Sequence, residues 1–434
     1  MAWFLYSDKQ TKLVEKSFKS YAHKVISLRV IISKQFEEIS NCFFYFYAIM
    51  KHVLATRLNQ LLQRRAQQGA LRQPLQLGEN ASQYIDFASN DYLGLARDKK
   101  HIKTIAQHYE KLAQIGATGS RLLTGNHWLC EDLERQIAQF HKSENALLFN
   151  SGYDANIGWL PALSRKTDVI LYDAAIHASL HDAMQMIHNT KLPFQHNNAQ
   201  HLEVLLADLR LAQPEQIIFV LVESVYSMDG DIAPLKTISE ICEKYNAILF
   251  VDEAHCHGIF GEKGEGLVQH LGLEKKVDLR LHTFGKAFGT HGAALLCSTL
   301  IKNYCLNYAR SLIYTTALDI HTLVSIQQGY FFLEKGSFAL VKNKLFSNVN
   351  YFKMQAQTLP YSLQINDSPI QFITIGNNQK AKALSAYLLQ NNIDVRPILA
   401  PTVNAGKEGL RICLHAYNSY VEIDLLITLI RNFI

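Results

Sequence analysis

The sequence contains little proline and no strong excess of either charge. Among 434 residues there are only 9 prolines, 19% of residues are charged and the formal net charge is +5. This composition argues against long disordered stretches. Because the basic residues are spread along the chain, the sequence contains no basic cluster of the kind that nucleic-acid binding requires. The length exceeds what one hydrophobic core usually serves, so we expect two folded parts.

Paired cysteines and long apolar runs are missing as well. The seven cysteines are scattered and include no C-x-x-C pair, so neither a disulfide framework nor a zinc site is indicated, and we expect no metal. The longest apolar run near the N-terminus, residues 42–50, is about half of the roughly 20 residues that a membrane span needs. No small-residue cleavage site follows it. We therefore expect a cytoplasmic protein without a membrane span.

Residues 1–49 differ from the rest of the chain, because they are rich in Lys, Phe and Tyr and contain no Gly or Pro. After Met50 the apolar residues recur at helical spacing. We interpret Met50 as the true start and residues 1–49 as a non-native or disordered extension; an interfacial membrane anchor is the alternative. The remaining chain is divided into an N-terminal arm, a large domain and a small C-terminal α/β domain, at residues 50–97, 98–335 and 336–434.

From about residue 140 the chain alternates apolar runs with amphipathic segments. Buried strands are predicted at residues 146–149, 168–172, 216–222 and 247–251. A helix is predicted over residues 234–245, where Pro234 occupies the first turn. Continuous apolar strands that alternate with helices predict an α/β fold with a mainly parallel sheet covered on both faces. In such folds ligands bind at the carboxyl ends of the strands.

Two residues of this part indicate a cofactor when they are taken together. Asp252 follows a predicted strand, and Lys286 lies between Gly285 and Gly289. Alone, the first is typical of a helix cap or loop carboxylate and the second of a solvated surface lysine. A Schiff-base cofactor needs a lysine of lowered pKa and a carboxylate that keeps a pyridine nitrogen protonated. The pair therefore indicates pyridoxal 5'-phosphate (PLP).

A third feature is the Asn-Ser-Gly-Tyr sequence of residues 150–153, between a predicted strand and a predicted helix. Small residues at a helix N-terminus expose main-chain N–H groups that can bind a phosphate. An ordinary turn is the alternative for this segment by itself.

The chain resembles the α-oxoamine synthase family of fold-type-I PLP enzymes. The resemblance covers roughly residues 57–434 and rests on stretches in family order at residues 87–95, 116–125, 150–156, 177–179, 223–231, 252–255, 283–286 and 401–403. It implies a large domain with a mainly parallel seven-stranded sheet and a smaller C-terminal α/β domain. Eight ordered matches are specific, although each one alone is weak.

The resemblance also implies a role for single residues. Lys286 matches the lysine that carries the cofactor and acts as acid and base, Asp252 the partner of the ring nitrogen, and His177 the histidine that stacks on the ring. Further cofactor-binding positions are implied at Gly152, Tyr153, Ser227, His255, Thr283 and Thr316, the last from the other subunit. Substrate-binding positions are implied at Arg72, Asn90, His177, Arg396 and Thr402.

One departure concerns the arginine that binds the amino-acid carboxylate in many relatives. The family places it directly before the Pro-Thr-Val segment, but here Leu399 and Ala400 precede Pro401. Arg396 is the nearest arginine and is the candidate for that task. His257 has no family role.

The activity implied by the resemblance is a decarboxylative condensation of L-alanine with a pimeloyl thioester, carried by acyl-carrier protein or coenzyme A, in biotin biosynthesis. A homodimer with shared active sites is implied too. Sister enzymes that use glycine or serine with other acyl thioesters are the first alternative. A non-catalytic subunit is a second, against which Lys286 argues. A nicotinamide-binding enzyme lacks the G-x-G-x-x-G after the first strand.

Overall fold

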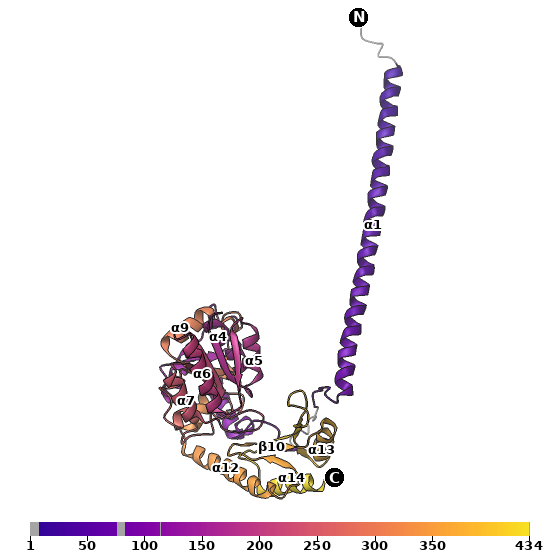
Figure 1. Ribbon diagram of the computed structural model, residues 1–434. Coiled ribbons are helices and arrows are strands. Elements are labelled where there is room, and N and C mark those ends of the chain that lie inside the picture. Colours follow the sequence, from indigo (N-terminus) through magenta and orange to yellow (C-terminus); the bar gives the residue numbers. More distant parts are fainter. Residues whose placement is uncertain (1–7, 76–82, 113, 434) are drawn as a thin grey trace. The chain divides into compact units, whose positions relative to one another are not determined.

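The computed structural model describes residues 8–75, 83–112 and 114–433 and divides into two compact units between Pro74 and Leu75. The first unit contains α1 (Asp8–Gln67), the long helix of Figure 1. The helix predicted from Met50 is confirmed, as the second part of this longer helix. Residues 1–7 lie outside the described residues, and the interpretation of residues 1–49 stays a prediction. Within the described ranges, no helix has both the length and the apolar character that a bilayer span requires.

The second unit is built on a seven-stranded sheet with the strand order β2-β8-β7-β6-β5-β3-β4. All neighbouring strands are parallel except β8, which is antiparallel to both of its neighbours. The mainly parallel sheet is thus confirmed. The strands are β2 (Asn145–Phe149), β3 (Val169–Asp173), β4 (Thr190–Phe194), β5 (Ile218–Glu223), β6 (Ile248–Asp252), β7 (Leu279–Thr283) and β8 (Ala293–Cys297).

Both faces of this sheet are buried, which explains why its strands are continuously apolar. In β5, Phe219 and Leu221 pack on one face with α4 and α5, while Val220 and Val222 pack on the other with α6 and α7. Figure 1 shows these helices around the strands. The helices of this part are α2 (Lys99–Tyr109), α3 (Trp128–Phe140), α4 (Gly152–Leu163), α5 (Ala178–Gln185), α6 (Ala199–Ala212), α7 (Leu235–Lys244), α8 (Leu267–His270), α9 (Thr299–Tyr308), α10 (Arg310–Ile313) and α11 (Ile320–Leu333).

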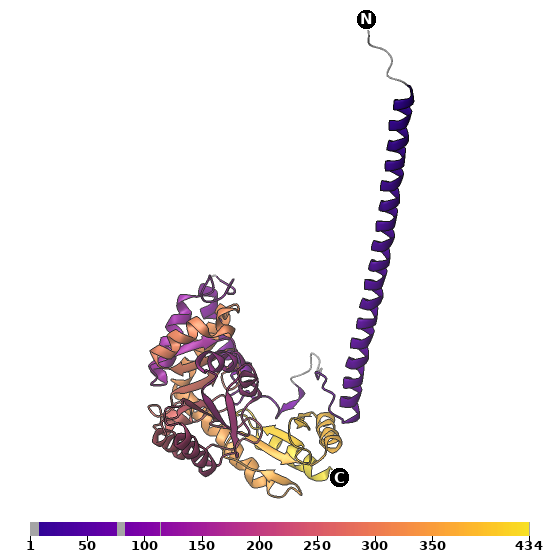
Figure 2. The same ribbon diagram turned by 45° about the horizontal axis from the view of Figure 1, so that its top comes forward.

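The C-terminal part has a core of its own around a four-stranded antiparallel sheet, drawn in orange and yellow in Figure 2. Its strands are β9 (Ser362–Gln364), β10 (Ile370–Thr374), β12 (Arg396–Ile398) and β13 (Gly409–Cys413). Its helices are α12 (Gly336–Ala356), α13 (Asn378–Gln390) and α14 (Tyr420–Asn432). A short parallel pair, β1 (Ile85–Asp86) with β11 (Ile393–Asp394), joins it to the segment before α2. The predicted domain boundaries themselves stay a prediction.

The carboxyl ends of the parallel strands gather the polar residues at one edge of the large sheet. Glu223 ends β5 and pairs in register with Asp252, which ends β6. Thr283 ends β7, and Gly152 starts α4 just after β2. This edge is where a doubly wound sheet is expected to bind its ligand.

Candidate active site

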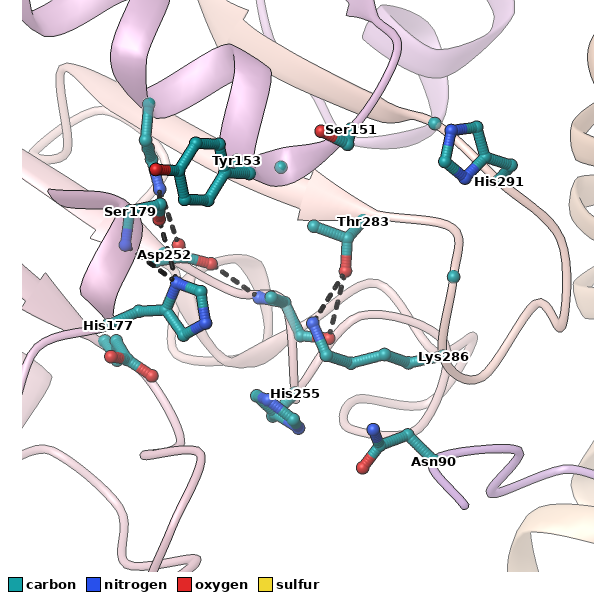
Figure 3. Close-up of a pocket in the computed structure, with 16 residues that line it drawn as sticks. Asn90, Ser151, Tyr153, His177, Ser179, Asp252, His255, Thr283, Lys286 and His291 are labelled. Atoms are coloured by element: carbon teal, nitrogen blue, oxygen red, sulfur yellow. Dashed lines mark hydrogen bonds between the residues drawn. The ribbon is translucent and has the colours of Figure 1, made fainter. Parts of the chain in front are cut away.

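A cavity of about 240 Å³ opens at this edge of the large sheet. Figure 3 shows the side chains that point into it, from the ends of β6 and β7, from the segments after β2, β3, β6 and β7, and, for Asn90, from the segment after β1. It brings together eight of the residues predicted from the sequence, which are Asn90, Gly152, Tyr153, His177, Asp252, His255, Thr283 and Lys286. The remaining lining residues are Ser151, Asn156, Ser179, Glu223, Ala254, Gly285, His291 and Gly292.

Lys286 reaches into the cavity from the turn after β7. Its Nζ atom donates to the Thr283 hydroxyl at 3.2 Å, as Figure 3 shows. Burial lowers the pKa of Lys286, while the charges of Asp252 and Glu223 act in the opposite direction. A lowered pKa increases the share of the neutral amine, which is the nucleophilic and basic form.

Asp252 lies in the floor of the cavity and is 5% exposed. One of its oxygens accepts from the Asn156 amide at 3.3 Å and the other from the main chain of Ala254 at 3.0 Å. The neighbouring Glu223 is 3% exposed, and one of its carboxylate oxygens has no hydrogen-bond partner among the described residues. Burial, followed by the charge of Asp252, raises the pKa of Glu223 well above its usual range.

His177 is the N-cap of α5. Its Nδ1 atom accepts from the main chain of Ser179 at 3.2 Å and lies 2.8 Å from the Ser179 hydroxyl. The same hydroxyl accepts from Asn156, which also donates to Asp252. A chain of polar contacts thus fixes the imidazole relative to the carboxylate.

The N-terminus of α4 forms another wall of the cavity. Ser151 caps this helix with its side chain, and the main-chain N–H groups of the first helical turn have no partner within a helix. A Cβ atom on Gly152 would lie only 2.6 Å from Cγ2 of Thr283. Glycine is therefore required here, because α4 approaches the end of β7 so closely.

Arg411 of β13 contacts Asn90, which lines the cavity. Its guanidinium donates to the Asn90 amide oxygen at 2.9 Å and to the main-chain oxygen of Ser227 at 2.7 Å. Within the part of the chain that the structure describes, Arg411 forms no ion pair with a carboxylate. His255, on the same side, is hydrogen-bonded to the Tyr92 hydroxyl at 2.8 Å.

Five predicted site residues are not among those that line the cavity. Ser227 contributes its main-chain oxygen to Arg411, and the main-chain oxygen of Thr316 accepts from Asn150. Arg396 forms an ion pair with Asp394 at 2.7 Å. Thr402 lies in the turn after β12, and Arg72 belongs to the first compact unit. Their roles stay predictions.

Sequence reasoning missed several residues that the fold adds to the site. Asn156, Ser179 and Glu223 lie inside recognised motif stretches, but nothing in the pattern separated them from their neighbours. The signal that could have indicated Glu223 is a carboxylate at the end of a strand otherwise apolar throughout. Arg411 gave no signal, because it lies outside the recognised stretches, eight residues after residues 401–403.

These residues fit PLP. The amine of Lys286 can hold its aldehyde carbon, and Asp252 can hold the proton of its ring nitrogen. The start of α4 and the Thr283 hydroxyl provide donors for its phosphate. The unpartnered oxygen of Glu223 is a further polar atom that a group in this cavity can satisfy.

The fold and the site are those of a PLP-dependent enzyme, and the chain belongs to the family of class I and II aminotransferases, whose family model matches residues 82–430. Within this family it is an α-oxoamine synthase. The resemblance stated from the motifs is thus confirmed, and so are the fold-type-I architecture and the cofactor.

The relatives and solved structures that support this assignment match most of the chain. The 8-amino-7-oxononanoate synthase of Emericella nidulans is 39% identical over 373 residues, which cover 81% of this chain and 90% of that protein. The serine palmitoyltransferase of S. paucimobilis, a variant solved with PLP and myriocin bound, is 27% identical with a TM-score of 0.75, covering 80% and 86%. The 8-amino-7-oxononanoate synthase of Francisella tularensis is 27% identical with a TM-score of 0.67, covering 80% and 97%.

Proposed function

We propose that this chain is a PLP-dependent acyltransferase that condenses L-alanine with a pimeloyl thioester. The products are 8-amino-7-oxononanoate, CO2 and the free thiol carrier, so the enzyme acts in biotin biosynthesis. The observation that carries the proposal is the convergence of Lys286 and Asp252 on one buried cavity. Curated relatives at 34–39% identity that are named for this activity support the choice of substrates.

Bound PLP supplies an electron-withdrawing ring that stabilises negative charge at the α-carbon of the amino acid. With PLP in the cavity, Asp252 would hold the proton on the ring nitrogen, and His177 would cover the ring. Lys286 removes the α-proton with its Nζ atom and returns a proton after CO2 has left. The lowered pKa of Lys286 suits this exchange, because burial increases the share of the neutral amine, which can accept a proton.

The carboxylate of the amino acid needs a cation, and we assign it to Arg411 in preference to Arg396. Arg411 lies beside Asn90 at the cavity and has its hydrogen bonds to neutral groups. Arg396 is already paired with Asp394. A planar guanidinium can bind a carboxylate through two parallel hydrogen bonds.

We further propose that the enzyme works in the cytoplasm as a homodimer whose active sites take Thr316 from the partner. Acyl-carrier protein and coenzyme A are the two candidate acyl carriers. The many large apolar side chains exposed around residues 115–128 and 308–314, among them Ile115, Leu123 and Tyr314, support an extensive subunit interface.

The test is a thiol-release assay with purified protein and PLP. L-alanine with pimeloyl thioester should release thiol, whereas glycine or serine with other acyl thioesters should not. Lys286→Ala should abolish turnover and the visible absorbance of lysine-bound PLP, while the exposed-surface variant Lys275→Ala should keep both. Running coenzyme A and carrier-protein donors side by side identifies the carrier.

A second candidate, serine palmitoyltransferase activity, is favoured by the higher TM-score of that structure, 0.75 against 0.67. Turnover with serine and palmitoyl thioester alone would establish it in place of the first. The other sister activity, that of 2-amino-3-ketobutyrate CoA ligase, is examined in the same assay through glycine. A protein without any turnover or PLP absorbance would be a non-catalytic subunit.

A further inference from the structure

Three buried histidines form a cluster behind the candidate active site. His141 follows α3, His257 lies in the turn after β6, and His282 belongs to β7. Their exposed fractions are 0%, 1% and 0%. Their ring centroids lie 4.2 Å (His141–His282), 4.6 Å (His257–His282) and 5.2 Å (His141–His257) apart.

The ring nitrogens of this cluster are only partly used. Among the described residues, Nδ1 of His141, Nδ1 of His282 and both nitrogens of His257 are buried without a hydrogen-bond partner. The main chain of Thr283 lies near His257 and that of Glu265 lies near His141, but neither is in hydrogen-bond geometry with these unpartnered nitrogens. Buried polar atoms are nearly always satisfied, so each of the three rings has a nitrogen that calls for a partner.

The nitrogens that are used have the partners that metal-binding histidines usually have. Nε2 of His282 lies 3.0 Å from a carboxylate oxygen of Glu253, which is itself completely buried. Nε2 of His141 lies 2.9 Å from the Tyr330 hydroxyl. In metal sites the second ring nitrogen is commonly held by a carboxylate or another acceptor, which orients the imidazole and fixes its tautomer.

We propose that His141, His257 and His282 bind one divalent ion of the zinc class. Each residue can offer one nitrogen, and these three atoms lie within 4.8 Å of one another. Tetrahedral zinc at about 2.0–2.1 Å from each nitrogen brings ligand atoms to about 3.4 Å from one another. The ligand atoms, which lie within 4.8 Å of one another, must therefore move closer together when the ion binds. The sequence did not indicate this site, because the three histidines are far apart in the chain and form no spaced motif.

The charges near the cluster set its expected affinity. Glu253 supplies a negative charge behind His282, and Arg280 donates to the main-chain oxygen of His141 from the same neighbourhood. The arginine opposes the binding of a cation. We therefore expect weaker binding than in a site with a carboxylate or thiolate ligand in direct contact with the ion.

The role of the ion is structural. None of the three histidines lines the cavity that holds Lys286. His282 directly precedes Thr283 in β7, and the His257 ring packs against Phe284 and Phe288, at 5.6 and 4.6 Å between centroids. An ion on these histidines stabilises the segment that carries Lys286, from the side that faces away from the cavity.

The experiment measures metal on the full-length holoenzyme, expressed with added Zn²⁺ and purified without chelating resins. Elemental analysis should give about one zinc per chain after dialysis, and X-ray absorption should show nitrogen ligands at about 2.0 Å. Protein expressed with Co²⁺ should show the visible bands of a tetrahedral cobalt site. These readouts are independent of turnover, so they distinguish failure of this proposal from failure of the proposed function.

His257→Phe keeps an aromatic ring in the cluster and should lower bound zinc at least about tenfold, since a three-ligand site that loses one ligand binds far more weakly. The matched control His270→Gln changes an exposed histidine and should leave the zinc content at the wild-type value. Wild-type protein that retains PLP absorbance but no zinc, and shows no cobalt bands, would overturn the proposal. Equal zinc in His257→Phe would overturn it too.

Discussion

Lys286 obtains its chemistry from burial more than from any single neighbour. Burial is the largest influence on its pKa and lowers it, although Asp252 and Glu223 favour the charged form. The same residue at the surface would be a protonated, solvated amine. At the scale of the residue, burial therefore lowers the pKa of an ordinary side chain and increases the share of its neutral, basic form.

Arg411→Lys should raise the KM for L-alanine about 10- to 100-fold, because hydrogen bonds to a charged group contribute about 1.5–3 kcal/mol and the lysine loses the planar fork. The absorbance of bound PLP should stay. The measurement is steady-state kinetics at varied L-alanine concentration. Arg396→Lys is the matched control and should change KM little; the opposite ranking of the two variants would return the assignment to Arg396.

Gly152→Ala should weaken PLP binding about 5- to 150-fold, because overpacking typically costs about 1–3 kcal/mol. The added Cβ atom meets Cγ2 of Thr283 at 2.6 Å and forces α4 and β7 apart. Titration of the protein with PLP, followed by absorbance, measures the change. Gly336→Ala is the control, since nothing lies within 4 Å of its added Cβ atom. Equal PLP affinity in both variants would contradict the close approach.

At the scale of the elements, loops after neighbouring strands are tied together by charge. His196, just after β4, contacts Asp173 at the end of β3 and Asp231 in the loop after β5, at 2.7 Å each. Burial lowers the pKa of His196, but the two carboxylates outweigh this effect and raise it to about 10. The loop that Asp231 anchors also contains Ser227, which accepts from Arg411.

His196→Gln should lower the free energy of unfolding by about 1–2 kcal/mol at pH 6. The expected loss is no larger because water reaches His196 and screens its ion pairs. The folded pKa of His196 is raised above its unfolded value of about 6.5, so its stabilisation is complete below that pH. It is lost as the pH rises through about 10. Denaturant unfolding at several pH values measures this, with the exposed-residue variant His188→Gln as control. A loss of stability that does not change with pH would contradict a role for the ion pairs of His196 with Asp173 and Asp231.

At the scale of the whole molecule, the hydrophobic cores all come from the second compact unit. Among the described residues, the buried members of the four cores begin at Phe87. The first unit consists mainly of α1. We therefore expect the second unit to fold on the cores that these buried residues form.

A chain that starts at Met50 should keep the thermal midpoint and PLP absorbance of the full chain, because the buried core members among the described residues all follow it. Differential scanning calorimetry and absorbance measure both. A chain that starts at residue 90 is the control: it loses Phe87, which is 0% exposed, and should unfold at lower temperature. Loss of PLP binding in the first truncation would show that residues 1–49 have a function. Mass spectrometry of the natively expressed N-terminus tests the predicted start directly.

The fold was predictable where a local pattern reports burial. The strands predicted at residues 146–149 and 247–251 correspond to β2 and β6, because a strand buried on both faces is apolar at every position. β4 was missed, since Pro193 and the charged Lys191 in this edge strand break that pattern. The length of α1 was missed as well, because residues 1–49 show no clear join to the later pattern.

The sequence by itself determined the family, the cofactor and the core of the site, since Asp252, His177 and Lys286 lie in motifs whose residue types are dictated by the chemistry of PLP. The tertiary structure alone decided which further groups share the site. Asn156, Glu223 and Arg411 reach it through strand register and through packing of the C-terminal sheet. It also brought three distant histidines together. Such contacts depend on long-range pairing between strands and helices, and no local pattern of residues encodes it.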